Sequence, residues 1–337
     1  MAYKSNNIVA IDDNRAGSFA NVTVQNNGFL EVNSSDGFQG TVAGYTSGGY
    51  GPGDRRLIDK FPFATDTNAT AVGALVGTGS YSGGGQSSST HGYKASGFPR
   101  TNVNSAIEKF PFAADTNASF VGTLSINENS ASGQSSSTSG YASGSGTAGH
   151  LPGDNIDKFP FATDSNATDI GSLTVGRGLS AGSSSSTHGY ASGGYAPGDP
   201  AVIIHNVIDK FPFATDAGAS DVGDLSQARR DPNGQSSTTH GYASGGSIPP
   251  ANPIIQVNTI EKFPFATDTN ATDIADLTQA RFRGVGQSST ISGYSSGGTG
   301  TPSVTNVIDK FPFSSDTNAT DVGDLTVARY SGSGQQD

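Results

Sequence analysis

The chain has 337 residues, including 47 glycines and no cysteine, and its formal net charge is −11. The lack of cysteine excludes a disulfide framework and a thiolate metal site. An acidic chain lacks the basic footprint expected for binding nucleic acid, and no apolar run approaches the roughly 18–20 residues of a membrane helix. We therefore expect neither nucleic-acid binding nor membrane insertion.

The first thirty-five residues differ in pattern from the rest of the chain. Short apolar stretches at Ile8–Ile11, Val22–Val24 and Phe29–Val32 alternate with turn-forming Asp, Asn and Gly residues. This pattern predicts a small β-rich segment over residues 1–35. Met1–Asn7 carries one positive charge and no apolar stretch, so a secretory signal is not expected.

A Lys-Phe-Pro-Phe motif then recurs at intervals of 48 to 52 residues. Its copies begin at Lys60, Lys109, Lys158, Lys210, Lys262 and Lys310. Self-similarity at this period indicates one supersecondary unit that is stacked on copies of itself. We therefore predict a single repeat domain over residues 36–337.

One repeat, Gly234 to Arg281, predicts four short strands and no helix. Gly, Ser, Thr, Pro and Asn dominate it, and no window has apolar residues at helical spacing. The expected strands are Gln235–Thr239, Tyr242–Gly246, Ile260–Phe265 and Ala271–Leu277. Four antiparallel strands per repeat are typical of a propeller blade, so the chain is predicted to be an all-β, six-bladed β-propeller. A β-solenoid is the alternative, but its coils are usually shorter.

The repeat also predicts how the blades pack and how the ring closes. Ser and Thr runs suit the crowded axis, paired Phe and Tyr side chains suit the space between blades, and neighbours such as Asp59 and Lys60 suit ion pairs between blades. Residues 332–337 look like the start of a Ser-tract strand that is not completed, and residues 37–49 look like a segment from Gln to Gly-Gly with no blade before it. The N-terminal strands therefore either complete the last blade, or each Ser tract opens a contiguous blade and the ring closes by packing alone.

These residues resemble the kelch repeat. Tyr190-Ala-Ser-Gly-Gly, Ile208-Asp-Lys-Phe, Asp216 and Ala228-Arg229 follow the order of that repeat. The resemblance covers about residues 36 to 337 and implies a kelch-like propeller. It departs in two respects: the usual Trp is absent, and the Arg is missing from the first two copies.

Variation between the copies is concentrated at one end of the predicted blades. Length varies in the connector after Gly-Gly, as in Tyr195–Asn206 and Ser247–Asn258, and the link from the fourth strand to the next blade varies in sequence. Loops on a rigid scaffold commonly carry recognition, although drift of exposed loops gives the same pattern. The candidate binding residues at this end are Tyr195, His205, Asn206, Arg281 and Arg283.

Three histidines are further binding candidates. His91, His188 and His240 share one repeat position, where Ser139 and Ser292 stand in two other copies. Such a ring could bind a metal, but a small polar turn residue before Gly-Tyr explains the same pattern, and we predict no metal site.

The acidic residues do not predict catalysis. Asp-Thr-Asn-Ala-Thr-Asp (268–273) offers fewer ligands than a calcium loop, and a local Asx turn accounts for its residues. The acids are periodic, and neither Gly-x-Ser-x-Gly nor His-Glu-x-x-His occurs. We predict no catalytic residue, no cofactor and no enzymatic activity.

The N-terminal segment suggests a role. Ile8-Val-Ala-Ile-Asp-Asp-Asn-Arg15 resembles the N-termini of tail-associated proteins of marine bacteriophages, especially cyanophages, and the Lys-Phe-Pro-Phe-Ala repeats resemble those of the same group. The resemblance implies an N-terminal attachment segment that binds other virion proteins, and a propeller displayed outward. It also implies assembly in the host cytoplasm and localisation in the virion.

The predicted function is therefore that of a virion structural protein, a phage tail or tail fibre component for host adhesion or partner docking. Its partners would be other virion proteins and a host-surface glycan or receptor, and it would be oligomeric within the particle. The alternative is a non-enzymatic intracellular interaction scaffold or a carbohydrate-binding, lectin-like propeller.

Overall fold

The computed structural model divides the chain into two compact units, Met1–Ser35 and Asp36–Asp337. It describes residues 4–5, 8–9, 22–24, 30–32, 39–76, 80–99, 105–127, 129–145, 152–196, 203–249, 254–300 and 303–337. In the first unit, β1 (Lys4–Ser5) pairs with β2 (Ile8–Val9) and β3 (Val22–Val24) pairs with β4 (Leu30–Val32), both antiparallel. All regular structure in the described residues is β, and they contain no helix long and apolar enough to cross a membrane.

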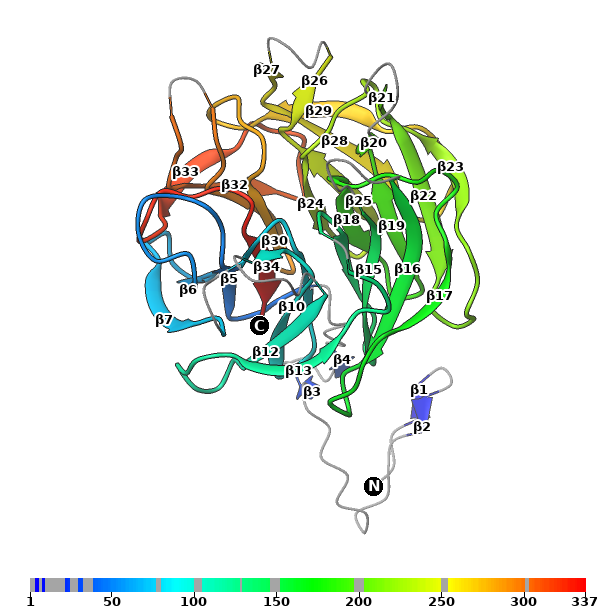
Figure 1. Cartoon of the computed structure of the whole chain (residues 1–337), viewed down its shortest axis with the longest axis horizontal. Coiled ribbons are helices and arrows are strands. Elements are labelled where there is room, and N and C mark those ends of the chain that lie inside the picture. Colours follow the sequence, from blue (N-terminus) through cyan, green and yellow to red (C-terminus); the bar gives the residue numbers. More distant parts are fainter. Residues whose placement is uncertain are drawn as a thin grey trace. The chain divides into compact units, whose positions relative to one another are not determined.

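The second unit is a six-bladed β-propeller, in which four-stranded antiparallel sheets surround a central axis (Figure 1). From the axis outward, blade 1 is β34 (Ser333–Gln336), β5 (Ala43–Ser47), β6 (Leu57–Pro62) and β7 (Thr70–Ala74). Blade 2 is β9 (Gly84–Ser87), β10 (His91–Ala95), β12 (Ala106–Pro111) and β13 (Ser119–Thr123). Blade 3 is β14 (Ser132–Ser135), β15 (Ser139–Ser145), β16 (Gly153–Pro160) and β17 (Thr168–Ser172).

The remaining blades repeat this order. Blade 4 is β18 (Ala181–Ser184), β19 (His188–Ser192), β22 (Val207–Pro212) and β23 (Ser220–Asp224). Blade 5 is β24 (Asn233–Ser236), β25 (His240–Ser244), β28 (Thr259–Pro264) and β29 (Thr272–Asp276), and blade 6 is β30 (Val285–Ser288), β31 (Ser292–Ser296), β32 (Val307–Pro312) and β33 (Thr320–Asp324). Short hairpins join β20 (Tyr195–Ala196) to β21 (Ile203–Ile204) and β26 (Ser247–Ile248) to β27 (Ile255–Gln256). β8 (Ser80–Tyr81) and β11 (Phe98–Pro99) form a further two-stranded antiparallel sheet, with β9 and β10 between them in the chain.

The ring closes through the C-terminal strand. β34 pairs antiparallel with β5, with Ser333 opposite Ser47 and Gln335 opposite Tyr45. The last residues of the chain thus supply the innermost strand of the blade whose other three strands lie within residues 43–74. The prediction that the two ends share a blade is confirmed, and the alternative of closure by packing alone is wrong.

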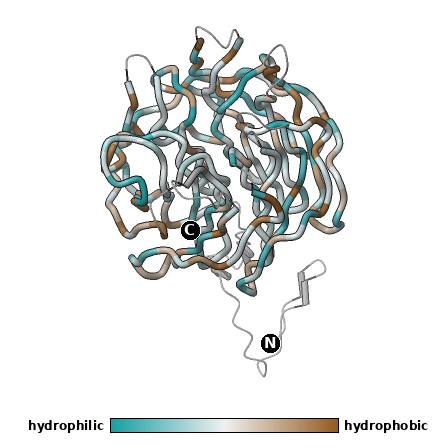
Figure 2. Tube along the Cα trace, viewed as in Figure 1, coloured by the Kyte–Doolittle hydropathy of each residue, from teal (hydrophilic) through white to brown (hydrophobic). Residues whose placement is uncertain are grey.

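Aromatic side chains pack between neighbouring blades, as predicted. Each repeated Tyr contacts both Phe rings of the next blade; Tyr45 lies 5.5 Å from Phe110 and 4.9 Å from Phe112 between ring centroids. The same contact joins Tyr294 of blade 6 to Phe61 and Phe63 of blade 1, at 5.4 and 4.9 Å. Buried Ile and Leu side chains of each blade join the Tyr and Phe contacts, so the hydrophobic core lies between the blades around the ring. Figure 2 shows hydrophobic and hydrophilic positions spread along the chain in all parts of the ring.

Glycine, not serine, occupies the narrowest part of the axis. The first strand of blade 5 ends at Ser236, because Ser237–Thr239 form the turn in which Ser237 Oγ accepts a hydrogen bond from His240 N. A Cβ on Gly234 would lie 2.0 Å from the carbonyl oxygen of Gly182, and one on Gly286 would lie 2.0 Å from that of Gly234. Real Cβ atoms do not approach that closely, so the predicted Ser and Thr runs stand at the ends of the innermost strands and the Gly at their centre.

Candidate functional site at the mouth of the axial channel

The turns at one end of the blades are nearly identical, and we call this end the uniform face. It carries the turn after each innermost strand and the Asp-containing turn after each third strand. His91, His188 and His240 lie here in separate blades, and the Nδ1 atom of each is 2.8 Å from the Oγ1 atom of the preceding Thr. Partial burial lowers the pKa of each of these imidazoles. These contacts make the histidines part of their turns.

The Asp-x-Asn turns join neighbouring blades instead of satisfying their own backbone. Lys210 Nζ lies 2.9 Å from Asp268 Oδ1 of the next blade, and Asn270 Oδ1 accepts a hydrogen bond from Asp224 N of the preceding one. The equivalent ion pair between Lys310 and Asp66 links blade 6 to blade 1. The prediction of a local Asx turn is therefore wrong, because the side-chain acceptor, Asn270 Oδ1, binds a backbone N–H of the adjacent blade and not one of its own turn. Across the described residues, no three His, Cys, Asp or Glu side chains are grouped as metal ligands would be.

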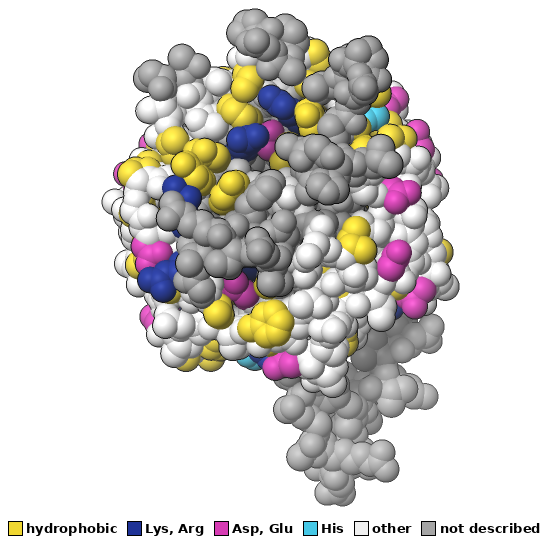
Figure 3. Space-filling view, viewed as in Figure 1, with side chains coloured by type: hydrophobic (Ala, Val, Ile, Leu, Met, Phe, Trp, Pro, Cys, Tyr) yellow, Lys and Arg dark blue, Asp and Glu magenta, His cyan; other side chains and the backbone are white. Residues whose placement is uncertain are grey.

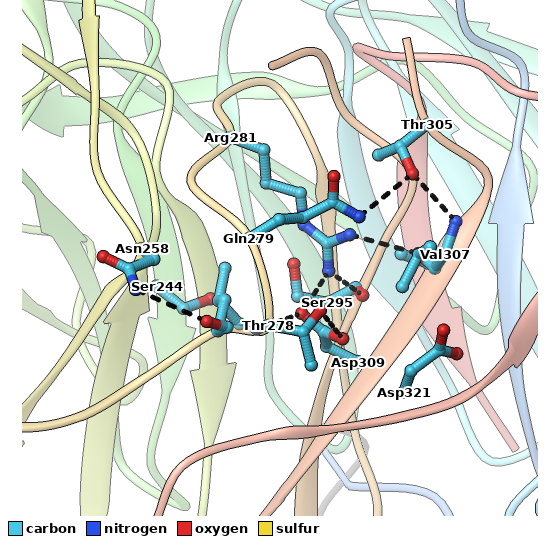
Figure 4. A network of polar contacts seen from close by, with 12 residues as sticks. Ser244, Asn258, Thr278, Gln279, Arg281, Ser295, Thr305, Val307, Asp309 and Asp321 are labelled. Atoms are coloured by element: carbon cyan, nitrogen blue, oxygen red, sulfur yellow. Dashed lines mark hydrogen bonds and ion pairs between the residues drawn. The ribbon is translucent and has the colours of Figure 1, made fainter. Parts of the chain in front are cut away.

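Arg281 is buried between blades 5 and 6. Its guanidinium lies 2.9 Å from Asp309 Oδ2 and donates a hydrogen bond to Ser295 O, while Thr278 Oγ1 donates to Asp309 Oδ1 (Figure 4). Both side chains of the ion pair are 0% exposed. Arg177 with Asp209 and Arg329 with Asp59 repeat this arrangement. Arg281 is thus a structural residue that a ligand at the surface does not reach.

At the opposite end, which we call the variable face, the links between blades form a closed ring around the axis. Six residues of these links have positive φ angles between 55° and 64°: Ser82, Ser130, Leu179, Asp231, Arg283 and Ser331. The backbone N–H of each donates to the carbonyl oxygen of the equivalent residue in the preceding link, at 2.7 to 3.0 Å, and the bond from Ser82 to Ser331 completes the circle. This left-handed conformation is uncommon for residues other than Gly, and such residues are enriched at functional sites.

Side chains at this ring break the sixfold repetition. The residues just before the ring positions are Tyr81, Asn129, Gly178, Arg230, Phe282 and Tyr330. Eight residues form a continuous series of contacts over one side of the ring, and we call them the rim arc: Tyr195, Arg230, Asp231, Arg283, Tyr330, Tyr50, Arg55 and Tyr81. They come from links and connectors around blades 4, 5, 6 and 1, so only folding brings them together.

The contacts within the rim arc are aromatic and ionic. Arg55 Cζ lies 3.7 Å from the centre of the Tyr50 ring, whose centroid lies 5.3 Å from that of Tyr330. Arg283 Nε donates to Asp231 Oδ1 at 3.3 Å, and Arg230 Nε lies 3.9 Å from Asp231 Oδ2. Two arginines therefore share one carboxylate that is only 3% exposed, and the arc carries an excess of positive charge on an acidic protein.

The ring opens into a cavity of about 150 Å³ along the axis. Gly and Ser of the innermost strands line it, together with Asp231, Asn233 and Arg283. Asp231 Oδ2 and Asn233 Oδ1 are buried and accept no hydrogen bond from the protein. Burial raises the pKa of Asp231, although Arg283 and Arg230 act in the opposite direction.

The chain enters the propeller at the uniform face. Gln39 Nε2 donates to the carbonyl oxygens of Ser236 and Ser289, both at 3.2 Å, and Gly40 N donates to Ser288 O. These acceptors stand at the ends of the innermost strands of blades 5 and 6. The entry point of the chain therefore lies at the end of the propeller opposite the rim arc.

The candidates from the sequence are divided between these places. Tyr195 and Arg283 belong to the rim arc, whereas His205 and Asn206 are half-buried in the connector of blade 4, where burial lowers the pKa of His205. Sequence reasoning missed Tyr50, Arg55, Tyr81, Arg230, Asp231 and Tyr330. For the residues in the links, the available signal was the diversity of two adjacent positions, which is visible once the copies are aligned on the Gly three residues after each ring position. Tyr50 and Arg55 lie instead in the connector after Gly48-Gly49.

No protein-family model matches this chain, and no curated protein matches it.

Proposed function

We propose that the chain is a bacteriophage virion structural protein, a tail or fibre component whose propeller binds the host surface or a partner protein. One observation carries this proposal. The chain enters the propeller at Gln39 on the uniform face, whereas the rim arc lies on the variable face. A propeller attached through residues 1–35 can thus present its diverse side chains away from the attachment.

The side chains of the two faces also support attachment at the uniform face and recognition at the variable face. On the uniform face, the turn carboxylates are engaged in ion pairs between blades, as Asp268 is with Lys210. On the variable face, aromatic and arginine side chains are gathered in one arc. Figure 3 views the propeller from one side, where hydrophobic, Lys, Arg, Asp and Glu side chains lie among a mostly white surface of other side chains and backbone. Residues of this kind are enriched where proteins recognise partners.

The finer assignments belong to the same proposal. The propeller is of the kelch type, which the order Tyr190, Gly193, Gly194, Arg229 supports, and residues 1–35 bind other virion proteins, which the resemblance of Ile8–Arg15 supports. The protein is non-enzymatic, assembles in the host cytoplasm and is oligomeric in the particle. The small axial cavity supports a surface binder, because pockets for small molecules usually exceed about 300 Å³.

Incorporation into particles tests the proposal. Phage particles propagated in host cells that produce tagged full-length chain, or a chain lacking residues 1–35, are purified and probed for the tag. We expect the full chain in the particles, and we expect the shortened chain in the soluble fraction with an unchanged melting temperature, because residues 1–35 form a separate unit. Equal incorporation of both chains would contradict the attachment role, and absence of the full chain from particles would contradict the virion role.

A further inference from the structure

We propose that the rim arc is a binding site for an acidic saccharide, a sugar chain that carries carboxylate, phosphate or sulfate groups. This inference deepens the proposed function, since it rests on the variable face being the binding face and names what that face binds. Three observations carry it: the charge of the arc, its aromatic rings and the polar lining of the cavity that opens beside it.

The charge of the arc selects an anion. The arc contains three arginines but only one carboxylate, that of Asp231, which is buried and paired with Arg230 and Arg283. The planar guanidinium matches carboxylate, phosphate and sulfate groups with two parallel hydrogen bonds. On a chain with a net charge of −11, a local excess of arginine attracts anions to this place while the remaining surface repels them.

The aromatic rings select a ligand with flat, partly apolar faces. Tyr50, Tyr81 and Tyr330 form a cluster in which Tyr50 lies 5.5 Å from Tyr81 and 5.3 Å from Tyr330 between centroids. Tyr50 is 36% exposed, which leaves ring surface for a ligand. A tyrosine offers an apolar body and a polar tip, and a sugar ring offers C–H faces edged by hydroxyl groups, so the two surfaces match.

The polar lining of the axial cavity suits a ligand rich in hydroxyl groups. Asp231, Asn233 and two glutamines line the cavity together with Gly and Ser of the innermost strands, and its apolar lining is limited to two alanines, Leu179, Pro232 and Val285. Its volume of about 150 Å³ is too small for a saccharide chain but accepts a substituent or the water that bridges to one. A sugar lying across the mouth turns its hydroxyl groups toward this polar lining and places its acidic group over the arginines.

Binding to purified full-length protein tests the inference without any particle, so its failure is distinct from failure of the proposed function. The probes are oligogalacturonate and dextran sulfate, with carboxyl-reduced oligogalacturonate and dextran as neutral counterparts and oligoglutamate as an acidic peptide. We expect at least one acidic saccharide to bind about tenfold more tightly than its neutral counterpart, with an affinity that falls as salt is added.

The chain offers a matched pair of variants, Arg55→Gln and Arg56→Gln, which remove the same charge from adjacent positions. Arg55 stacks on Tyr50, whereas Arg56 is held by Asp54 at 2.8 Å. We expect Arg55→Gln and Tyr50→Ala each to weaken binding about tenfold and Arg56→Gln to leave it unchanged, with melting temperatures equal to that of the parent. Equal binding of acidic and neutral saccharides, equal losses from both arginine variants, or tighter binding of oligoglutamate would overturn the inference.

Discussion

A buried lysine shows how single residues adjust the repeat. Blade 2 has no Arg to pair with its buried Glu108, because that Arg is missing from the preceding link. Lys94, which is 1% exposed, stands where Ala occurs in blades 3, 4 and 5, and its Nζ donates to Ser96 O at 2.7 Å. Its charge acts on Glu108, whose pKa burial raises and Lys94 lowers. Lys94 thus supplies a positive charge from a different strand of the blade.

Lys94 predicts a pH dependence of stability. Burial lowers the pKa of Lys94 from 10.5 to about 8, so between these values the unfolded chain holds a proton that the folded chain has released. The free energy of unfolding should therefore rise with pH above about 8, by at most about 1.4 kcal/mol per pH unit. Burial also raises the pKa of seven tyrosines, so their ionisation in the unfolded chain opposes this rise as the pH approaches 10: Tyr45, Tyr93, Tyr141, Tyr190, Tyr242, Tyr294 and Tyr330.

Denaturant unfolding at several pH values between about 8 and 9 measures this rise in the parent and in Lys94→Met. The variant keeps the length and packing of the side chain and should lose the contribution of Lys94, so its free energy of unfolding should rise less steeply with pH than that of the parent. If Lys94→Met retains the same slope as the parent, the assignment of the titrating group is wrong.

For single residues, the sequence predicts the contacts that recur in every blade, but it does not predict a contact that is made in one blade alone. The Tyr–Phe packing is predictable because all the copies share it. Lys94 is not, because only the folded register of β10 and β12 places it near Glu108. Asp231 is equally hidden, since its neighbours Arg230 and Arg283 come from two different links.

Strand β34 is the element on which closure of the ring depends. It pairs with β5 of its own blade, Gln336 N donates to Ser87 Oγ of blade 2, and Ser333 Oγ donates to Gly83 O. Removing it exposes the edge of β5 and leaves blade 1 with three strands, and such open edges promote aggregation. Blade 1 is thus the blade at which the ring closes, because its first strand comes from the C-terminal end of the described chain and its other strands from residues 43–74.

Deletion of residues 333–337 should lower the melting temperature by several degrees, because it removes a buried strand and its hydrogen bonds. A synthetic peptide covering residues 331–337 should restore the melting temperature when added in excess, whereas a scrambled peptide of the same composition should not. Differential scanning calorimetry measures both effects. An unchanged melting temperature after deletion would show that packing between blades closes the ring without this strand.

For the propeller as a whole, the sequence predicts the number of blades and the difference between its two faces. Only the structure shows at which face the chain enters the propeller. Connector lengths and link diversity are sequence properties, and they are enough to place variation at one end of the blades. The position of Gln39 at the other end is not predictable, because its acceptors Ser236 and Ser289 lie about 200 residues or more away in the chain. The proposed function is therefore directional, with attachment at one face and recognition at the other.

The most direct measurement of that direction uses the absence of native cysteine. Ile254 on the variable face and Ile291 on the uniform face are 42% and 71% exposed, and each can be replaced singly by Cys. Both variants should react with a maleimide in the purified protein. In intact particles, Ile254→Cys should remain reactive and Ile291→Cys should be protected. Protection of Ile254→Cys with free reaction of Ile291→Cys would place the variable face inward and contradict the proposed function.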